Sequence, residues 1–407
     1  MTIAPTVRGW CPGLHTPMEA ADGWLVRVRP PLGRLSGAQA RQIARAATMH
    51  GNGLIELTSR GNLQLRGLTS DGTRAFAHDM RIAGLASADA ATEARRGLLL
   101  SPLAGIDPAA APDAPDVIRA LDTALTNADT LRGLPAKFVI AVECGGHVPA
   151  GTLRADIVAR TTNTGWMVVC GDRALACPGA DVARIAVSLA HALAAMEPVM
   201  RPLRDPTLGQ AAFARIRMPD TATAPSARPH RPVLAGPLPG HAMGVVLPPG
   251  PIAARMLEDI ARWCDERGNG HMRVAPWRAI VLEQCDMPPP LPGLITQGDD
   301  PRLRVWACIG TRGCACATRD VIADAHALAP DLPPGVSLHV SGCAKGCAHP
   351  APADITLVAG PGGYGLCPHG RADNTPVDIG LSLAQIHPIV RGWSPAPHRS
   401  HPTPREN

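Results

Sequence analysis

An internal duplication is the feature of this sequence that most constrains its fold. The triplet Gly-Asn-Gly stands at residues 51–53 and again at 268–270, each time between a segment with helical periodicity and two short strand-like segments. A further strand precedes each helical segment, so both copies have the order β-α-β-β, and two such copies predict a pseudo-symmetric pair. The strands that we expect are 24–29, 54–57 and 63–66 in the first copy and 242–247, 271–274 and 279–283 in the second.

Local signals place the helix boundaries in both copies. Ser36-Gly-Ala-Gln39 is a capping box, which predicts a helix that starts there and runs to about His50. In the second copy, Pro251 fits the first turn of a helix, because a backbone N–H has no helical partner there. The Gly-Asn-Gly triplets then end the two helices.

A second repeat lies outside the β-α-β-β copies. The strand-like segments 138–145 and 155–158 recur at 336–343 and 353–356, and the second segment of each copy begins Ala-Asp-Ile. The chain therefore alternates two kinds of segment, which we call A1, B1, A2 and B2. They cover about residues 20–70, 95–200, 240–287 and 300–390, respectively.

Four cysteines of B2 have no counterparts in B1. Cys308 and Cys314 form a C-x5-C pair, and Cys343 and Cys347 form a C-x3-C pair, each with glycine nearby. Four thiolates are the ligand set of a [4Fe–4S] cluster, and glycine lets backbone N–H groups approach the sulfurs. The alternatives are unrelated buried thiols and a structural zinc site, although zinc-binding cysteines usually stand closer together in sequence. Cys316 leaves a second choice of ligand open, since a C-x7-C pair is geometrically conceivable.

Composition narrows the class of protein. The N-terminus has no apolar segment typical of a signal peptide, which predicts a cytoplasmic protein whose 12 cysteines bind metal rather than form disulfides. The net charge of +5 comes without a basic run or interleaved aromatic residues, so we expect no nucleic-acid binding. No apolar run is long enough to span a membrane. No glycine-rich phosphate loop opens a helix, so we expect electrons from a separate donor protein.

A polar strand face in A1 is the second candidate site. Thr58, Arg60, Asn62, Gln64 and Arg66 alternate along one face of the expected hairpin, and all can donate hydrogen bonds while none is acidic. Such a face suits a ligand rich in carboxylates, although a solvated strand face has the same pattern. Arg96 and Lys137 are further candidate cations, whereas the pattern indicates ordinary surface charges at Arg27, Arg29, Arg273 and Arg278.

Together these pieces resemble the sulfite/nitrite reductase family over nearly the whole chain. The resemblance rests on residues 27–33, on residues 57–64 and on the spacing of the four B2 cysteines. The chain is similar in particular to a branch of that family that acts in aerobic cobalamin biosynthesis, through residues 8–18, 101–107 and 340–350.

The resemblance implies an α+β fold. Its expected parts are duplicated ferredoxin-like βαββ halves plus two α/β domains with pseudo-two-fold symmetry, which bind a porphyrinoid between the repeats. The implied domains are 1–75 (N-terminal arm and first ferredoxin-like half), 76–200 (first α/β domain), 201–240 (linker), 241–290 (second ferredoxin-like half), 291–390 (second α/β domain, with the cluster) and 391–407 (disordered tail).

The resemblance also implies roles for particular residues. In the reductases, the positions that match Arg60, Arg96 and Lys137 bind the carboxylates of sirohaem, and the position that matches Cys347 bridges the cluster and the sirohaem iron. This chain has Val139 where the reductases have a second lysine, and it is shorter than most of them. A pocket of this kind can hold precorrin-3A, itself a sirohaem-like tetrapyrrole, in place of the cofactor.

The implied activity is that of a monooxygenase. One oxygen atom of O2 becomes the C20 hydroxyl of precorrin-3A, and the ring A acetate closes a γ-lactone. The implied cofactors are the [4Fe–4S] cluster, which passes single electrons, and a mononuclear non-haem iron, which activates O2. The sequence shows no recognisable two-histidine-one-carboxylate triad for that iron, and His349 is the candidate catalytic residue. Two other functions stay open: a sirohaem-dependent assimilatory sulfite or nitrite reductase, and a non-catalytic iron–sulfur electron-transfer module.

Overall fold

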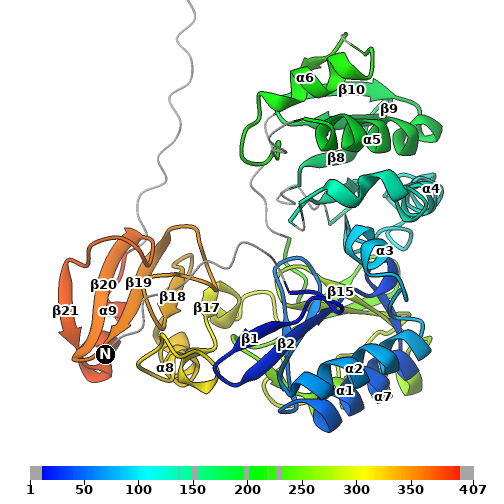
Figure 1. Ribbon diagram of the computed structural model, residues 1–407. Coiled ribbons are helices and arrows are strands. Elements are labelled where there is room, and N and C mark those ends of the chain that lie inside the picture. The colour runs from blue at the N-terminus through cyan, green and yellow to red at the C-terminus, as the bar shows by residue number, and fades with distance from the viewer. Residues whose placement is uncertain are drawn as a thin grey trace, which may run out of the picture. The chain divides into compact units, whose positions relative to one another are not determined.

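The computed structural model describes residues 12–135, 137–148, 155–196, 201–218, 220–225 and 232–394. These residues form two compact units (Figure 1). The larger unit contains the described residues up to 247 and residues 251–298, and the smaller unit contains 248–250 and 299–394. Segments A1, B1 and A2 thus lie in the larger unit, and B2 lies in the smaller one.

Two antiparallel sheets of the larger unit exchange strands between A1 and A2. The A1 strands are β1 (Met18–Ala20), β2 (Gly23–Val28), β3 (Arg34–Ser36), β4 (Leu54–Leu57) and β5 (Leu63–Leu68). The A2 strands are β12 (Gly236–Leu238), β13 (Ala242–Val246), β14 (Ile252–Ala253), β15 (His271–Ala275) and β16 (Ala279–Glu283). The strand orders are β1-β2-β5-β4-β14 and β12-β13-β16-β15-β3, so each sheet ends on a strand from the other copy. This reciprocal exchange confirms the duplicated α+β fold.

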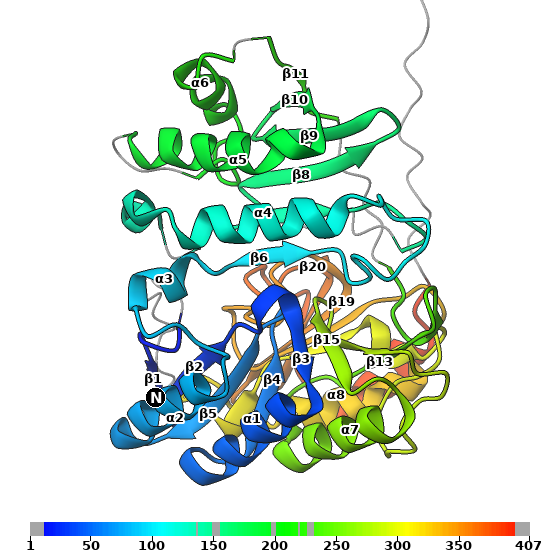
Figure 2. The same ribbon diagram turned by 90° about the vertical axis from the view of Figure 1, so that its right-hand side faces the viewer.

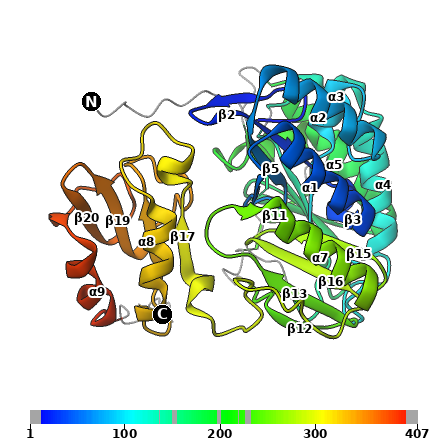
Figure 3. The same cartoon turned by 90° about the horizontal axis from the view of Figure 1, so that it is seen from below.

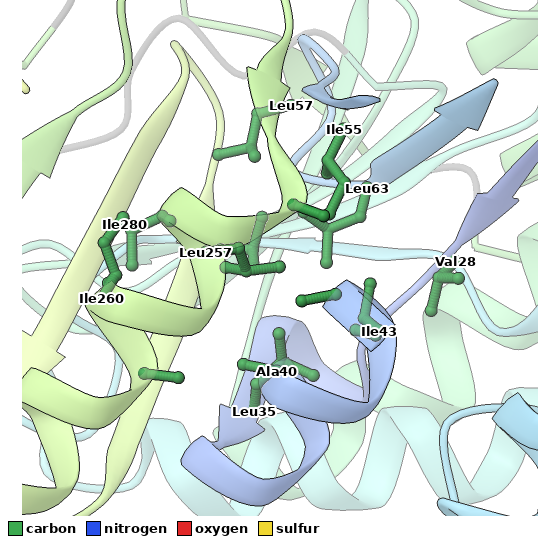
Figure 4. Close-up of a cluster of buried hydrophobic side chains, with 14 of the residues drawn as sticks. Val28, Leu35, Ala40, Ile43, Ile55, Leu57, Leu63, Leu257, Ile260 and Ile280 are labelled. Atoms are coloured by element: carbon green, nitrogen blue, oxygen red, sulfur yellow. The ribbon is translucent and has the colours of Figure 1, made fainter. Parts of the chain in front are cut away.

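The helices of the two copies share one hydrophobic core. Helix α1 (Gly37–His50) packs beside α7 (Ala254–Arg267), and α2 (Ser70–Ile82) lies next to α1. Figure 4 shows Ala40 and Ile43 of α1 in the same cluster of buried side chains as Leu257 and Ile260 of α7. Complete burial of one such leucine or isoleucine contributes about 1.5–3 kcal/mol. Neither copy can therefore separate from the other without exposing its core.

The predicted helix boundaries are right for α1 and wrong for the start of α7. The Ser36 hydroxyl accepts the N–H of Gln39 at 3.2 Å, and the Gln39 side chain accepts the N–H of Ser36 at 3.0 Å, so the capping box forms. Helix α7 begins at Ala254 rather than at Pro251, because Ile252 and Ala253 pair with β4 as strand β14. A strand that pairs with the other copy has no local signal in the sequence.

B1 forms a six-stranded mixed sheet with helices on one face (Figure 2). Its order is β11-β10-β9-β8-β7-β6; β6, β7 and β8 are parallel and the others antiparallel. The strands are β6 (Leu98–Leu100), β7 (Ile140–Glu143), β8 (Ile157–Thr162), β9 (Gly165–Cys170), β10 (Arg173–Cys177) and β11 (Ala222–Thr223). The helices are α3 (Ala90–Arg95), α4 (Ala114–Thr126), α5 (Gly179–Ala194) and α6 (Leu208–Arg215).

The segment expected as a linker, 201–240, contains regular structure. It carries α6, β11 and β12, and the buried side chain of Phe213 joins the B1 core. The segment is rich in proline, alanine and arginine, and this composition hides the signal of its few large apolar residues.

The smaller unit, in which Figure 3 labels β17, β19, β20, α8 and α9, repeats the topology of B1. Its strand order is β17-β18-β19-β20-β21, in which β17, β18 and β19 are parallel and the rest antiparallel. Helices α8 and α9 contribute to one core with the sheet. Of the tail expected to be disordered, residues 395–407 lie outside the described part of the chain. The elements are β17 (Val305–Ala307), α8 (Val321–Leu328), β18 (Leu338–Ser341), β19 (Ala353–Gly360), β20 (Gly363–Gly370), β21 (Asp378–Leu381) and α9 (Leu383–Arg391).

The helices of the described structure are short or carry polar residues compared with membrane-spanning helices. Within the ranges that the structure describes, no helix is long and apolar enough to cross a bilayer.

Candidate functional site

A pocket lies along β6 in the larger unit. Its volume is about 680 Å³, including space that is open to solvent. Four segments form its walls: residues 29–33, the hairpin turn 60–62, β6 with its flanks at 96–102, and the end of β15 at 273–276. The walls thus come from A1, B1 and A2, and the interlocked fold holds them together.

Arginine dominates the charge of this pocket. Arg29, Arg60, Arg96 and Arg273 line it, against a single lining acid, Asp122 on α4. Burial raises the pKa of the Asp122 carboxyl, and the charge of Arg96 acts in the opposite direction. The pocket is therefore suited to bind an anion with several carboxylates, since guanidinium groups pair with carboxylates in well-defined geometry.

Arg60 and Asn62 lie in the turn between β4 and β5, not on a strand as the alternation predicted. Thr58 builds this turn: its hydroxyl accepts the N–H of Asn62 at 3.1 Å, and its own N–H donates to the Asn62 carbonyl at 2.9 Å. Gly61 has φ +66°, and a Cβ there would stand 3.1 Å from the Val274 carbonyl oxygen. Glycine thus lets the A1 and A2 hairpins approach closely, with Arg60 and Asn62 on the pocket wall.

Three residues of the predicted polar face, Thr58, Gln64 and Arg66, do not belong to the pocket lining. Arg66 is only 5% exposed, and two of its nitrogens donate to the Asp22 carboxylate at 2.9 Å each. Gln64 accepts from Arg27 at 2.9 Å and donates to Glu56. None of the five residues of this face is acidic, but Asp22 and Glu56, from neighbouring parts of the chain, pair with Arg66 and Gln64.

Arg273 is a pocket residue that the sequence analysis assigned to the surface. Its Nε donates to Glu283 at 2.7 Å and another nitrogen donates to the carbonyl of Ala104, while Arg34 from β3 binds the same carboxylate at 2.7 Å. Burial alone would raise the pKa of Glu283, but the two arginines hold it at about 2. Glu283 thus stays ionised and fixes the orientation of Arg273 at the pocket.

The duplication contained a signal for Arg273. Arg273 and Glu283 stand on β15 and β16 where Glu56 and Arg66 stand on β4 and β5, so the pair recurs with its charges reversed. Arg29 had no comparable signal; it lies just after β2 and donates to the carbonyl of Ala94 at 2.9 Å.

Arg96 and Lys137 precede the neighbouring parallel strands β6 and β7. Since β6 and β7 are parallel and Leu98 pairs with Ile140, these two cations lie at the same end of the two strands. Arg96 lines the pocket and pairs with Glu93 at 3.0 Å. Lys137 is half-buried and is not one of the lining residues.

The N-terminal arm is only partly described. His15 forms a hydrogen bond of 2.9 Å with the Ser87 carbonyl, whereas residues 8–11 lie outside the described part of the chain.

The cysteines of B2 gather at one end of the smaller unit. Cys308 follows β17, and Cys343 and Cys347 follow the neighbouring parallel strand β18. The Cys308 sulfur accepts the N–H of Gly342 at 3.2 Å. Burial raises the pKa of Cys308, the N–H groups of Gly342 and Gly310 lower it, and the nearby Cys314 and Cys343 raise it again.

Cys347 and Cys316 belong to the same group of thiols. Loss of hydration raises the pKa of Cys347 to about 11. The charge of Lys345 acts against this shift, and the neighbouring thiols of Cys308, Cys343 and Cys314 add to it. Loss of hydration and then the charges of Cys314 and Cys343 raise the pKa of Cys316. Five free thiols therefore share one region, and the structure does not separate Cys316 from the other four.

The chemistry of this donor set, thiols with a backbone N–H directed at one sulfur, fits the ligands of an iron–sulfur cluster. Across the residues with described positions, no three or more His, Cys, Asp or Glu side chains converge on one ion position. Thiolates that hold a cluster bind different iron atoms and need not converge. Backbone N–H groups directed at sulfur, as at Cys308, are the environment that tunes such clusters.

His349, the candidate catalytic residue, packs against aromatic rings. It stacks on Trp306 with ring centroids 4.0 Å apart, and it meets His339 edge-on at 5.8 Å. Its Nε2 is 3.4 Å from the carbonyl oxygen of Pro352. Burial and His349 lower the pKa of His339 to about 4, so His339 is neutral near pH 7.

B1 keeps the geometry of the cysteine site without its thiols. Ser101 follows β6 as Cys308 follows β17, and its hydroxyl accepts the N–H of Cys144 at 3.0 Å, as the Cys308 sulfur accepts that of Gly342. Asp107 stands six residues after Ser101, where Cys314 stands after Cys308, and it binds His147 at 2.8 Å. Hydrogen bonds thus close the B1 site that thiols occupy in B2.

Comparison with known proteins first defines the class. The model of the nitrite/sulfite reductase ferredoxin-like half domain matches residues 17–80, the part that contains Arg60. The structure of the Mycobacterium tuberculosis NirA protein matches with a TM-score of 0.68 over 88% of this chain and 76% of that chain, at 19% identity. The fold is therefore that of the nitrite/sulfite reductase class.

Two relatives narrow the assignment. A precorrin-3B synthase from Sinorhizobium sp is 33% identical over 96% of this chain and 90% of its own length. A ferredoxin–nitrite reductase from Synechococcus elongatus is 27% identical over 82% of this chain and 76% of its own length. The chain belongs to the precorrin-3B synthase family.

Proposed function

We propose that this protein is a monooxygenase that converts precorrin-3A to precorrin-3B in cobalamin biosynthesis. The observation that carries the proposal is the identity of 33% with a precorrin-3B synthase over 96% of the chain. The reaction places one oxygen atom of O2 at C20 of the tetrapyrrole and closes the ring A acetate into a γ-lactone. The arginine-lined pocket supports this assignment, because the substrate is rich in carboxylates.

The pocket arginines bind the substrate in this account. Arg29, Arg60, Arg96 and Arg273 supply charged donors, and Asn62 supplies a neutral one. A hydrogen bond between charged partners contributes roughly 1.5–3 kcal/mol, so several together orient a macrocycle firmly. Thr58 shapes the turn that presents Arg60 to the substrate. Lys137 adds positive charge at the end of β7 that lies beside Arg96. Gln64 and Arg66 stabilise β5, the strand that follows the turn.

The thiols of the smaller unit hold the redox group in this account. Cys308, Cys314, Cys343 and Cys347 are the proposed ligands of a [4Fe–4S] cluster, which supplies single-electron transfer when bound. The N–H of Gly342 stabilises the thiolate of Cys308. Cys316 lies close to the same thiols and is left outside the ligand set because C-x5-C is the family spacing.

Oxygen chemistry requires two electrons and two protons beyond the substrate. One atom of O2 enters the product and the other leaves as water. Because the sequence has no glycine-rich phosphate loop that opens a helix, we expect a separate donor protein to supply the electrons. The resemblance implies a mononuclear iron for O2 activation, but the described side chains offer no ready three-ligand site for it. His349 is a candidate on sequence grounds alone.

A reductase with sirohaem is the competing function, favoured by the similarity to the Synechococcus elongatus nitrite reductase. Iron and acid-labile sulfide analysis together with the absorption spectrum of the anaerobically purified protein separates the two. We expect iron and sulfide in cluster proportions and no Soret band from extractable tetrapyrrole. A strong sirohaem spectrum in the purified protein would favour the reductase and remove the synthase assignment. An intact cluster in a protein that binds no tetrapyrrole would favour the third function, a non-catalytic iron–sulfur electron-transfer module.

A further inference from the structure

His339 is a buried histidine that the fold leaves unsatisfied. It stands in the middle of β18 with 0% of its surface exposed, and neither ring nitrogen has a hydrogen-bond partner in the described structure. Leaving a buried donor or acceptor unpaired costs roughly 1–3 kcal/mol. Native proteins keep few such groups, and those they keep usually serve a bound group, a water or a redox centre.

The loop that carries two of the cysteines covers this histidine. In register across the sheet, Trp306 pairs with His339 and His339 with Thr356, while Leu338 and Val340 face the core on the opposite side. The ring of His349 lies edge-on to His339. A Cβ at Gly346, one residue before Cys347, would stand 3.7 Å from Cε1 of His339. His339 therefore lies directly beneath the Cys343–Cys347 loop.

The first copy of the domain shows that the fold does not require a histidine here. The B1 residues in the same register are Leu99, Ala141 and Val158, where B2 has Trp306, His339 and Thr356. The three B1 side chains form an apolar layer with no polar atom to satisfy. The copy without the cysteines has an alanine at this position, and the copy with them has a buried, unpaired donor.

We propose that His339 donates a ring N–H to a sulfur of the iron–sulfur cluster at the Cys343–Cys347 end. The inference rests on the proposed cluster and assigns it a residue that the ligand pattern does not include. A hydrogen bond to cluster sulfur disperses the negative charge of the reduced state, so it raises the reduction potential. His339 keeps its proton throughout; the cluster alone gains and loses the electron that the donor protein supplies.

The direct test is the midpoint potential of the cluster in the full-length holoprotein, measured by redox titration followed by EPR. His339→Phe keeps a ring and removes the N–H, and His339→Ala introduces the residue of the first copy. We expect both variants to keep iron and sulfide and to reduce about tenfold less favourably, which for one electron is a fall of about 59 mV. His339→Asn and His339→Gln replace the ring N–H by an amide N–H. We expect at least one of them to have a midpoint potential that lies no more than half of this fall below that of the parent protein.

Thr356→Val is the matched control. It alters the neighbouring buried position of the same layer, where the Thr356 hydroxyl donates to the Gly370 carbonyl at 2.8 Å, and it removes no donor to sulfur. An unchanged potential in a fully loaded His339→Phe or His339→Ala protein would overturn the proposal, as would an equal shift in Thr356→Val. Parent protein that lacks iron and sulfide would instead contradict the cluster itself.

Discussion

The partners of each arginine, rather than its spacing in the sequence, decide its role in this protein. Alternation placed Arg60 and Arg66 on one face, yet Arg60 lines the pocket and Arg66 is buried against Asp22. The residue types near Arg66 along the chain gave no sign of this, because Asp22 comes from the turn between β1 and β2. The sequence analysis singled out Arg60 and Asn62, which line the pocket, but not Arg29 and Arg273, which line it too.

Replacing Arg60 tests the pocket. We expect Arg60→Ala to weaken the binding of precorrin-3A by roughly 10- to 100-fold, because one charge-assisted hydrogen bond worth about 1.5–3 kcal/mol is lost. Anaerobic absorption titration measures the dissociation constant. Arg74→Ala, which changes an exposed arginine of α2 paired with Asp71, is the control and should bind as the parent does. Equal affinity in Arg60→Ala would remove Arg60 from the site.

Replacing Arg66 tests the opposite role. Arg66→Ala leaves the Asp22 carboxylate without its main partner, and we expect a loss of about 3–5 kcal/mol in the free energy of unfolding. Urea denaturation of the larger unit, followed by circular dichroism, measures this loss. The double variant with Asp22→Asn should recover part of it, since the uncompensated charge is gone. A stable Arg66→Ala protein with weakened substrate binding would restore Arg66 to the pocket.

The cysteines allow a test of the ligand set. We expect Cys343→Ser to lose the cluster absorption and most of the bound iron, because one thiolate ligand is removed. Cys316→Ser should keep both, since the four proposed ligands are intact. Iron and sulfide analysis on the two variants, purified in parallel without oxygen, makes the comparison. Loss of the cluster in Cys316→Ser would replace Cys314 by Cys316 as the ligand.

At the scale of elements, strand exchange links the two halves through one carboxylate. Glu283 on β16 binds Arg34 on the exchanged strand β3 and Arg273 on β15. In A1 and A2, sequence patterns located the capping box of α1 and the strands β2, β4, β5, β13, β15 and β16, because those signals are local. They missed the other strands of these segments, among them β3 and β14, whose existence depends on a partner strand far away in the chain.

This bridge predicts a pH dependence. The folded-state pKa of Glu283 is about 2 against a usual value of 4.5, so its contribution is fully present above 4.5 and is lost as the pH falls towards 2. With allowance for the partial exposure of Arg34, we expect Glu283→Gln to cost about 2–3 kcal/mol in unfolding free energy at neutral pH. Denaturation at a series of pH values should show this difference shrinking below pH 4.5. A difference that stays constant in acid would contradict the bridge.

At the scale of the whole molecule, the duplication has produced two unequal copies of each part. A1 and A2 interlock and build the pocket with B1, whereas B2 carries the thiols. The repeats in the sequence predicted this order and the fold class. They could not reveal the hydrogen bonds that Ser101, Asp107 and His147 form in B1, at the positions equivalent to the cysteine site of B2. Those bonds depend on contacts between loops.

The activity proposed for this chain is the oxygenation of precorrin-3A. The most direct measurement is anaerobic incubation of the holoprotein with precorrin-3A and a reduced electron donor, followed by addition of ¹⁸O₂ and mass analysis of the tetrapyrrole. We expect a product that carries one labelled oxygen atom and forms only when both O2 and reductant are present. Unchanged precorrin-3A, together with reduction of nitrite or sulfite by the same preparation, would contradict the proposed activity.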